Sequence, residues 1–168
     1  MGKVEMLPVV DVNGTVLAAA ERSRCHGPER LLHPVVHLHV FDPVGKLLLQ
    51  RRAVTKKIQP GKWDTAVGGH VDFGESIDEA LIREVREEIG LEGFVPDPVA
   101  RYVFESSVER ELVNTFRTTV SSEFVPKREE SDIDELRFFT AGEIKQMIEC
   151  GDVTPNFAME YSKYLFVE

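Results

Sequence analysis

The segment 76–89, SIDEALIREVREEI, restricts the fold of this chain more than any other part of the sequence. Its apolar residues recur three and four positions apart, which is typical of a helix with one buried face. At about 100° per residue, the predicted buried stripe consists of Leu81, Ile82, Val85 and Ile89. Such a helix needs an apolar surface to cover, so the rest of the chain must supply a sheet or further helices.

The ends of this helix are marked by residue type. Ser76 followed three residues later by Glu79 is a capping-box pattern, which predicts the first turn. Gly90 fits the left-handed conformation that ends many helices. The segment 140–150 has the same signals, with a threonine and a glutamate three residues apart at its start and Gly151 after it.

The other apolar segments are short and read as strands. The predicted strands are 9–12 and 15–20 around an Asn-Gly turn, 35–41 and 46–51 around a second turn, 63–71, 99–108, 111–120 and 136–139. Segments 22–34 and 127–134 read as loops, and 158–166 as a third, short helix. Strands and helices mix without a regular βαβ alternation, so we expect an α+β fold with a mixed β-sheet covered by helices on its faces.

Length and composition limit the classes of function. The chain has 168 residues, which fits a single domain over 1–168. Its net charge of -9 repels nucleic acid backbones, so we expect no nucleic-acid partner. No apolar stretch approaches the ~18 residues of a membrane helix, and the first residues do not resemble a secretion signal. We therefore expect no membrane partner and a cytoplasmic location.

Three carboxylates lie beside the apolar stripe of the helix over 76–89. Glu84, Glu87 and Glu88 are three and four positions apart, so their side chains meet. Each like-charged pair costs roughly 0.2–0.5 kcal/mol on an exposed helix, and the negative end of the helix dipole disfavours anions in the last turn. A bound Mg²⁺, which prefers oxygen ligands, removes both penalties. The alternative is a solvated face of the helix.

The pattern around these glutamates resembles the Nudix box at every fixed position. It consists of Gly69, Glu75, Arg83-Glu84-Val85, Glu87-Glu88 and Gly90-Leu91 in the segment GHVDFGESIDEALIREVREEIGL. The resemblance implies a Nudix-type α/β/α sandwich and a metal-dependent hydrolase that cleaves a phosphoanhydride. The implied substrate is a small-molecule diphosphate, a nucleoside diphosphate linked to another group. The implied cofactor is Mg²⁺, with Mn²⁺ as an alternative.

The same resemblance implies residue roles. The implied metal ligands are the carboxylates of Glu84, Glu87 and Glu88 and the carbonyl of Gly69. Arg83 would orient the glutamates by ion pairing, and Glu75 would support the metal shell. The general base varies within this family, so Glu87, Glu88 and Glu111 all stay candidates.

A basic cluster precedes the box, with Arg51 and Arg52 at a predicted strand end and Lys56 and Lys57 after it. Arginine and lysine side chains here could clamp a diphosphate, because a guanidinium donates two parallel hydrogen bonds to phosphate oxygens. We take Arg51, Arg52 and Lys57 as candidate substrate-binding residues. The alternative is a strand end with solvated charges.

Five further residues suggest a rival function. The segments CHGPERLLHPVVHLHVF, LLLQRRAVTKKIQPGKWD and GGHVDFGES also resemble type 1 isopentenyl-diphosphate isomerase, a Nudix-fold relative. That resemblance implies a second metal site formed by His26, His33, His70, Glu109 and Glu111. His37 and His39, two apart on a predicted strand, share a face and are expected to be packed or hydrogen-bonded rather than metal-bound.

Two departures weigh against isomerase activity, and one of them is that the Nudix box, which is degenerate in the isomerase, is intact here. Gly68 stands where the isomerase needs a catalytic cysteine, and glycine can neither donate nor accept the proton that isomerisation moves. An isomerase-like enzyme and a non-catalytic Nudix-fold binding module are therefore kept as alternatives to the hydrolase. The C-terminal segment YSKYLFVE is either core or the contact of a homodimer.

Overall fold

The computed structural model describes residues 3–128 and 132–165. Its strands are β1 (Met6–Val10), β2 (Val16–Glu21), β3 (Leu32–Phe41), β4 (Leu47–Arg52), β5 (Trp63–Thr65), β6 (Val67–His70), β7 (Asp97–Glu105), β8 (Arg110–Thr119) and β9 (Ile133–Phe139). Its helices are α1 (Arg22–Cys25), α2 (Ile77–Ile89), α3 (Ala141–Cys150) and α4 (Pro155–Glu160), followed by the π-helical turn η1 (Tyr161–Leu165).

The main sheet is mixed, as predicted. Its strand order is β5-β4-β3-β8-β7, with β6 also paired to β3 and β9 also paired to β4. Strands β3 and β8 run parallel, and the other pairs are antiparallel. Strands β3 and β4 pair only at Phe41 and Leu47. Beyond that point β3 pairs with β6 and β4 pairs with β5, so the sheet divides into two halves.

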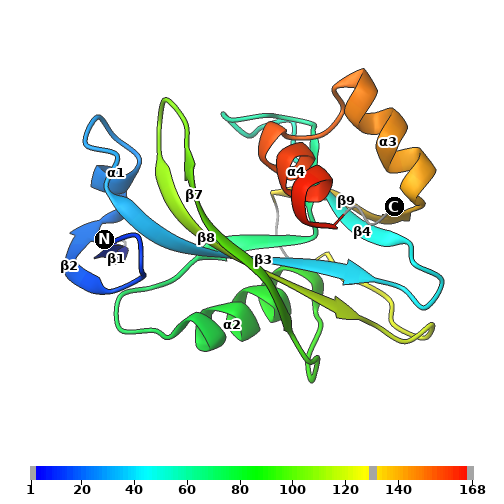
Figure 1. Ribbon diagram of the computed structural model, residues 1–168, viewed down its shortest axis with the longest axis horizontal. Helices are drawn as coiled ribbons and strands as arrows, with labels where there is room; N and C mark the ends of the chain where they lie inside the picture. The colour runs from blue at the N-terminus through cyan, green and yellow to red at the C-terminus, as the bar shows by residue number, and fades with distance from the viewer. Residues whose placement is uncertain (1–2, 129–131, 166–168) are drawn as a thin grey trace.

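Helices cover both faces of this sheet, with α2 on one side and α3 and α4 on the other (Figure 1). The alternation of side chains along a strand produces this arrangement. On β4, Leu48 packs in the core with α2, whereas Leu47 and Leu49 pack in the core with α3 and α4. The predicted α+β sandwich with a mixed sheet is confirmed.

Helix α2 begins and ends where the sequence predicts. Ser76 and Glu79 form the full capping box, and Gly90 ends the helix with φ +73°. The predicted buried stripe is wrong at one position, because Ile82 is 54% exposed. Glu88 is buried instead, at 8% exposure. On a helical wheel Glu88 lies about 20° from Leu81 and Ile82 about 100° from it, so the sheet covers Glu88 and leaves Ile82 in solvent.

Several element boundaries differ from the predictions. Segment 22–34, predicted as a loop, contains α1 and the first residues of β3, and 63–71 divides into β5 and β6. Strand β9 begins at Ile133, three residues before the predicted start, and residues 129–131 of the predicted charged loop lie outside the described residues. The last helix starts earlier, because Thr154 caps it with Pro155 at its first position.

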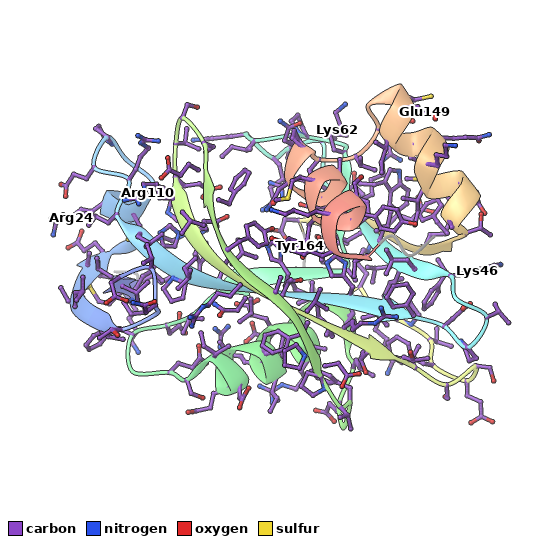
Figure 2. The ribbon with its side chains drawn as sticks, in the orientation of Figure 1. Arg24, Lys46, Lys62, Arg110, Glu149 and Tyr164 are labelled. Atoms are coloured by element: carbon purple, nitrogen blue, oxygen red, sulfur yellow. The ribbon has the colours of Figure 1, made fainter. Side chains whose placement is uncertain are left out.

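The C-terminal segment belongs to the core where it is described. Tyr161 and Leu165 pack against α3 and β4, and Tyr164, labelled in Figure 2, stacks on Tyr102 with ring centroids 5.5 Å apart. The predicted helical residue Phe166 lies outside the described residues. Within 3–128 and 132–165, no helix is long and apolar enough to cross a membrane.

Candidate active site and a histidine–glutamate cluster

Arg83 is the centre of a network of carboxylates on α2 and the loop before it. Its Nε and Nη2 donate to the two oxygens of Glu75 at 2.8 and 2.9 Å. Its Nη1 donates to Glu84 at 2.8 Å and to Glu87 at 3.3 Å. The hydrogen bonds from Arg83 hold the pKa of Glu75 below its usual range. One guanidinium therefore fixes three carboxylates on the same side of the helix.

Strand β6 approaches this network at Gly69, which has no side chain. A Cβ placed on Gly69 would lie 2.2 Å from Cδ of Glu84, far inside contact distance. The next residue, His70, accepts a hydrogen bond on its carbonyl from Nη2 of Arg83 at 3.0 Å. The backbone of Gly69 thus lies directly against the Glu84 carboxylate, where a larger residue would displace it.

Glu88 contributes a buried carboxylate with one unsatisfied oxygen. Its Oε1 accepts a hydrogen bond from Nε2 of Gln50 at 3.0 Å, and the same nitrogen donates to the carbonyl of Ala66 at 2.9 Å. Its Oε2 is buried and has no hydrogen-bond partner among the described residues. Burial raises the pKa of Glu88 well above its usual range, although the bond from Gln50 opposes this shift.

The ligand types on α2 suit a hard divalent cation, but Glu84, Glu87 and Glu88 are not among the described groups of three whose ligand atoms lie within 4.8 Å of one another. Burial also raises the pKa of Glu84, against the hydrogen bond from Arg83. Buried carboxylates that repel one another are stabilised by a nearby cation, and an unpaired buried oxygen is a ready ligand. All the donors are oxygens, which suits Mg²⁺ better than a softer metal. The metal-ligand roles of Glu84, Glu87, Glu88 and Gly69 stay predictions.

A pocket of about 90 Å³ opens beside Glu88, where the two halves of the sheet divide. It is lined by His37, Gln50, Arg52, Lys56, Asp64, Thr65, Gly68, Glu88 and Asp132. Arg52 lies 3.5 Å from Asp64, and Lys56 lies 2.6 Å from Asp132. Two cation–carboxylate pairs therefore lie in the lining of this pocket.

Of the predicted substrate-binding residues, the structure brings one to the pocket. Arg52 lines it, whereas Arg51 donates to the carbonyl of Gly61 at 3.4 Å and Lys57 is exposed elsewhere. The register of β4 with β9 shifts between Arg51 and Arg52, where one side chain lines the pocket and the other does not. Lys56 lines the pocket although it was not among the three candidates.

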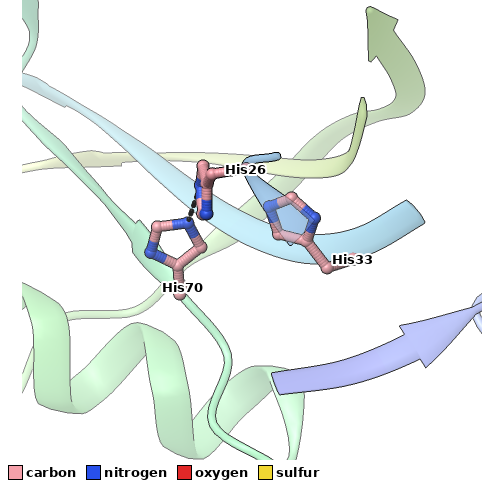
Figure 3. Close-up of side chains that lie close together, drawn as sticks. All are labelled: His26, His33 and His70. Atoms are coloured by element: carbon pink, nitrogen blue, oxygen red, sulfur yellow. Dashed lines mark hydrogen bonds between the residues drawn. The ribbon is translucent and has the colours of Figure 1, made fainter. Parts of the chain in front are cut away.

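The three predicted histidine ligands lie together, with His70 pointing away from α2 (Figure 3). His26 follows α1, His33 lies on β3 and His70 ends β6, with ring centroids 5.0 to 5.3 Å apart. Nδ1 of His26 lies 2.9 Å from the carbonyl of Arg22, and Nδ1 of His33 lies 2.8 Å from that of Leu31. A histidine held by Nδ1 presents Nε2 as a metal ligand.

Two glutamates of β8 and the turn before it complete this histidine–glutamate cluster. Glu109 lies 3.1 Å from Nε2 of His26, and Glu111 lies 4.0 Å from Nε2 of His33. The hydrogen bond to Glu109 raises the pKa of His26, and burial lowers that of His70 well below its usual range. Burial raises the pKa of Glu111 to about 7.

The cluster brings together side-chain atoms that can act as metal ligands. The ligand atoms of His26, His33 and His70 lie within 4.8 Å of one another, as do those of His33, Glu109 and Glu111. Nε2 of His33 is buried and has no hydrogen-bond partner in the described part of the chain. A divalent metal would give this nitrogen a partner and could bind the nitrogens of His26 and His70 as well, which are 3.2 Å apart.

Sequence reasoning missed other residues of the pocket. Gln50 is the one polar residue in the LLLQ run of β4, a signal that a buried amide has a specific partner. His37 and His39 share a face and are hydrogen-bonded, as predicted, but their partner is Glu160 of α4. No local pattern links Glu160 to residues 121 and 123 positions earlier.

The comparisons with known proteins concern the family and the fold. The family model described as NUDIX domain matches residues 31–156. A Nudix hydrolase of Yersinia pestis is 32% identical over 162 residues, covering 96% of this chain and 86% of that protein. An isopentenyl-diphosphate Delta-isomerase of Streptomyces griseus is 34% identical over 152 residues, covering 84% and 74%. A crystal structure from Deinococcus radiodurans has a TM-score of 0.74 at 25% identity, covering 89% and 92%.

The chain belongs to the Nudix family, because the family model matches most of its length and a relative above 30% identity aligns with nearly all of it. It is similar both to a hydrolase and to isomerases of this family.

Proposed function

We propose that this protein is a metal-dependent hydrolase that cleaves a phosphoanhydride bond. The observation that carries the proposal is the buried, unpaired Oε2 of Glu88 beside carboxylates that Arg83 holds in place. An unpaired buried carboxylate oxygen is costly in a protein that has no ligand for it. A cation site explains the buried oxygen, the repelling carboxylates and the missing side chain at Gly69 together.

Glu84, Glu87 and Glu88, with the carbonyl of Gly69, would hold the metal. When bound, Mg²⁺ polarises phosphoryl oxygens and lowers the pKa of a coordinated water. Arg83 keeps the carboxylates in position through four hydrogen bonds to Glu75, Glu84 and Glu87. Gln50 orients Glu88 by donating to Oε1, which leaves Oε2 directed away from the amide.

We propose that the base is one of the glutamates of α2. Glu87 has a side chain that is 42% exposed, so it can reach a water molecule, whereas Glu88 is buried. Glu111, the third candidate, contacts His33 and belongs to the histidine–glutamate cluster. The base accepts a proton from the attacking water, whose oxygen bonds to one phosphorus while the bridging P–O bond breaks.

The pocket beside Glu88 suits a diphosphate. Arg52 and Lys56 supply cationic donors to its lining, and Glu88, a proposed metal ligand, lines it as well. Positive charges around a P–O bond that breaks stabilise the negative charge on the leaving phosphate. We propose a nucleoside diphosphate linked to another group as the substrate class, with Mg²⁺ or Mn²⁺ as the cofactor.

A second metal site is supported by the histidine–glutamate cluster. Five residues from α1 through β8 converge there, and two of the imidazoles are oriented by backbone carbonyls. Mixed nitrogen and oxygen ligands favour Zn²⁺ or Mn²⁺ over Mg²⁺. This cluster also supports the isomerase alternative, but Gly68 supplies no group that can move a proton to or from a substrate carbon.

Phosphorus NMR tests the hydrolase directly. The purified protein is incubated with Mg²⁺ and a panel of nucleoside diphosphate sugars, nucleoside triphosphates, dinucleotides and isopentenyl diphosphate. We expect metal-dependent loss of one anhydride signal, which is absent with Glu88→Gln. Conversion of isopentenyl to dimethylallyl diphosphate with every anhydride intact would instead establish the isomerase. No change in any compound would favour the binding module.

A further inference from the structure

His37 lines the pocket, and the edge of its imidazole that carries Nδ1 is hydrogen-bonded to Glu160. A Cβ on Gly68, the residue opposite it on β6, would lie 3.4 Å from Cδ2 and 3.7 Å from Nε2 of the imidazole. On the other edge of the ring, Nδ1 donates to Oε2 of Glu160 at 2.9 Å. The missing side chain of Gly68 thus leaves Nε2 next to the pocket that His37 lines.

Glu160 is a fully buried anion with four donors. Its side chain is 0% exposed, and it accepts hydrogen bonds from His37, from Nε2 of His39 at 2.6 Å, and from the hydroxyl groups of Thr115 and Tyr102. Burial alone would raise the pKa of Glu160, but the charge of His37 and the hydrogen bonds of both histidines hold it well below its usual range. A carboxylate with this many donors stays ionised.

The imidazole of His37 is therefore kept in its cationic form. Burial disfavours the charged imidazole and lowers its pKa. The charge and hydrogen bond of Glu160 outweigh burial and raise the pKa of His37 to about 9. Both ring nitrogens of an imidazolium carry protons. Nδ1–H is taken by Glu160, and no hydrogen bond among the described residues uses Nε2. Arg52 and Lys56, in contrast, already have aspartate partners.

We propose that His37 binds a phosphate oxygen of the substrate through Nε2–H. Glu160 is the positioning residue, because its hydrogen bond to Nδ1 fixes the orientation of the ring. This proposal rests on the hydrolase function and adds a phosphate contact in the pocket that Glu88 also lines. The contact is electrostatic, because an acid that holds its proton this firmly is a poor proton donor near neutral pH. A charge-assisted hydrogen bond in a small pocket contributes to binding whether or not the bond is cleaved.

The test separates binding from turnover. Methylenediphosphonate, which has no cleavable bridge, is titrated into the protein with saturating Mg²⁺ and followed by calorimetry. The variant His37→Asn keeps an amide donor at the place of Nδ1 and loses the donor at Nε2. The matched control is His39→Gln, whose amide replaces Nε2 on the other side of Glu160, away from the pocket.

We expect His37→Asn to bind the diphosphonate at least about tenfold more weakly, and His39→Gln to bind it like the wild type. In the wild type, the ¹⁵N and proton signals of His37 Nε2–H should shift on titration, which a purely structural role would not produce. The NMR readout also covers the case in which His37→Asn does not fold.

Equal affinity of His37→Asn and wild type, an equal loss in both variants, or a wild type without saturable binding would each overturn the proposal. Failure of the hydrolase function has a different signature. Binding through His37 would persist, and the substrate panel would stay intact.

Discussion

Gly69 leaves room for the carboxylate of Glu84, since a Cβ on that glycine would lie 2.2 Å from Cδ of the glutamate. The glycine has no left-handed backbone angle, so conformational freedom does not explain its presence. Close packing explains the glycine, because Glu84 occupies the space that any side chain at residue 69 would fill. Strand β6 and helix α2 are thereby joined at the proposed metal site.

Gly69→Ala should damage the site and leave the fold intact. The added methyl group pushes Glu84 away from its hydrogen bond with Arg83, and a displacement of about 1 Å in a catalytic group costs about 100-fold in rate. We expect a loss of that size in Mg²⁺-dependent turnover. The control is Gly142→Ala in α3, where the nearest atom would lie 4.0 Å away. Full activity of Gly69→Ala would show that Glu84 can move without consequence.

Replacing the buried carboxylate should separate activity from stability. In Glu88→Gln the metal loses a charged ligand, so turnover should fall by orders of magnitude, and Glu87→Gln should do the same. The unfolding temperature without metal should stay equal or rise, because a buried carboxylate with an unpaired oxygen is itself destabilising. The stabilisation by Mg²⁺ should shrink, since it depends on binding to the folded state.

Thermal unfolding with and without Mg²⁺, beside phosphorus NMR, measures both effects. Glu92→Gln, an exposed glutamate three residues beyond the helix, is the matched control. If Glu88→Gln lost stability and activity in parallel, Glu88 would be structural.

Local patterns predicted most of the fold, and they indicated the carboxylates of the proposed site. The caps of α2 and α3 and the shared face of His37 and His39 depend on residues a few positions apart, so spacing reveals them. The burial of Glu88 in place of Ile82 was not predictable from residue type, because an apolar stripe places the isoleucine inside. Only the rotation of α2 against the sheet decides between them.

Long-range contacts set the remaining features. Glu160 meets His37 and His39 because α4 packs on the face of β3 that carries both imidazoles. The choice between Arg51 and Arg52 depends on the direction of β4 at its end, where its register with β9 shifts between these two residues. A sequence pattern records the basic cluster but not which of its members faces the pocket.

The histidine–glutamate cluster should bind a metal independently of α2. His26→Ala and His70→Ala each remove a ligand, so one equivalent of Mn²⁺ or Zn²⁺ per chain should be lost in equilibrium dialysis with elemental analysis. His39→Gln, whose imidazole contacts Glu160 instead, should keep the wild-type stoichiometry. Unchanged metal content in both alanine variants would remove the second site and leave His33 Nε2 a buried, unpaired nitrogen.

The pair of His37 and Glu160 should make stability depend on pH in a defined window. The folded protein raises the pKa of His37 to about 9, whereas an unfolded histidine titrates near 6.5. Between these values the folded state holds a proton that the unfolded state has lost, so stability is complete below about pH 6.5 and falls as pH rises through about 9. Glu111 and Asp64 also face His37 and add to the shift.

His37→Asn should flatten this part of the stability curve. One linked proton gives a slope of at most about 1.4 kcal/mol per pH unit, and the variant lacks that proton. Thermal unfolding followed by circular dichroism in EDTA, from about pH 6 to about pH 10, measures the difference. Glu111, with a pKa of about 7, has largely completed its own contribution before the steep part of the His37 window. Parallel curves for wild type and variant would mean that Glu160 does not hold the proton on His37, which would leave a neutral ring at the pocket wall near neutral pH.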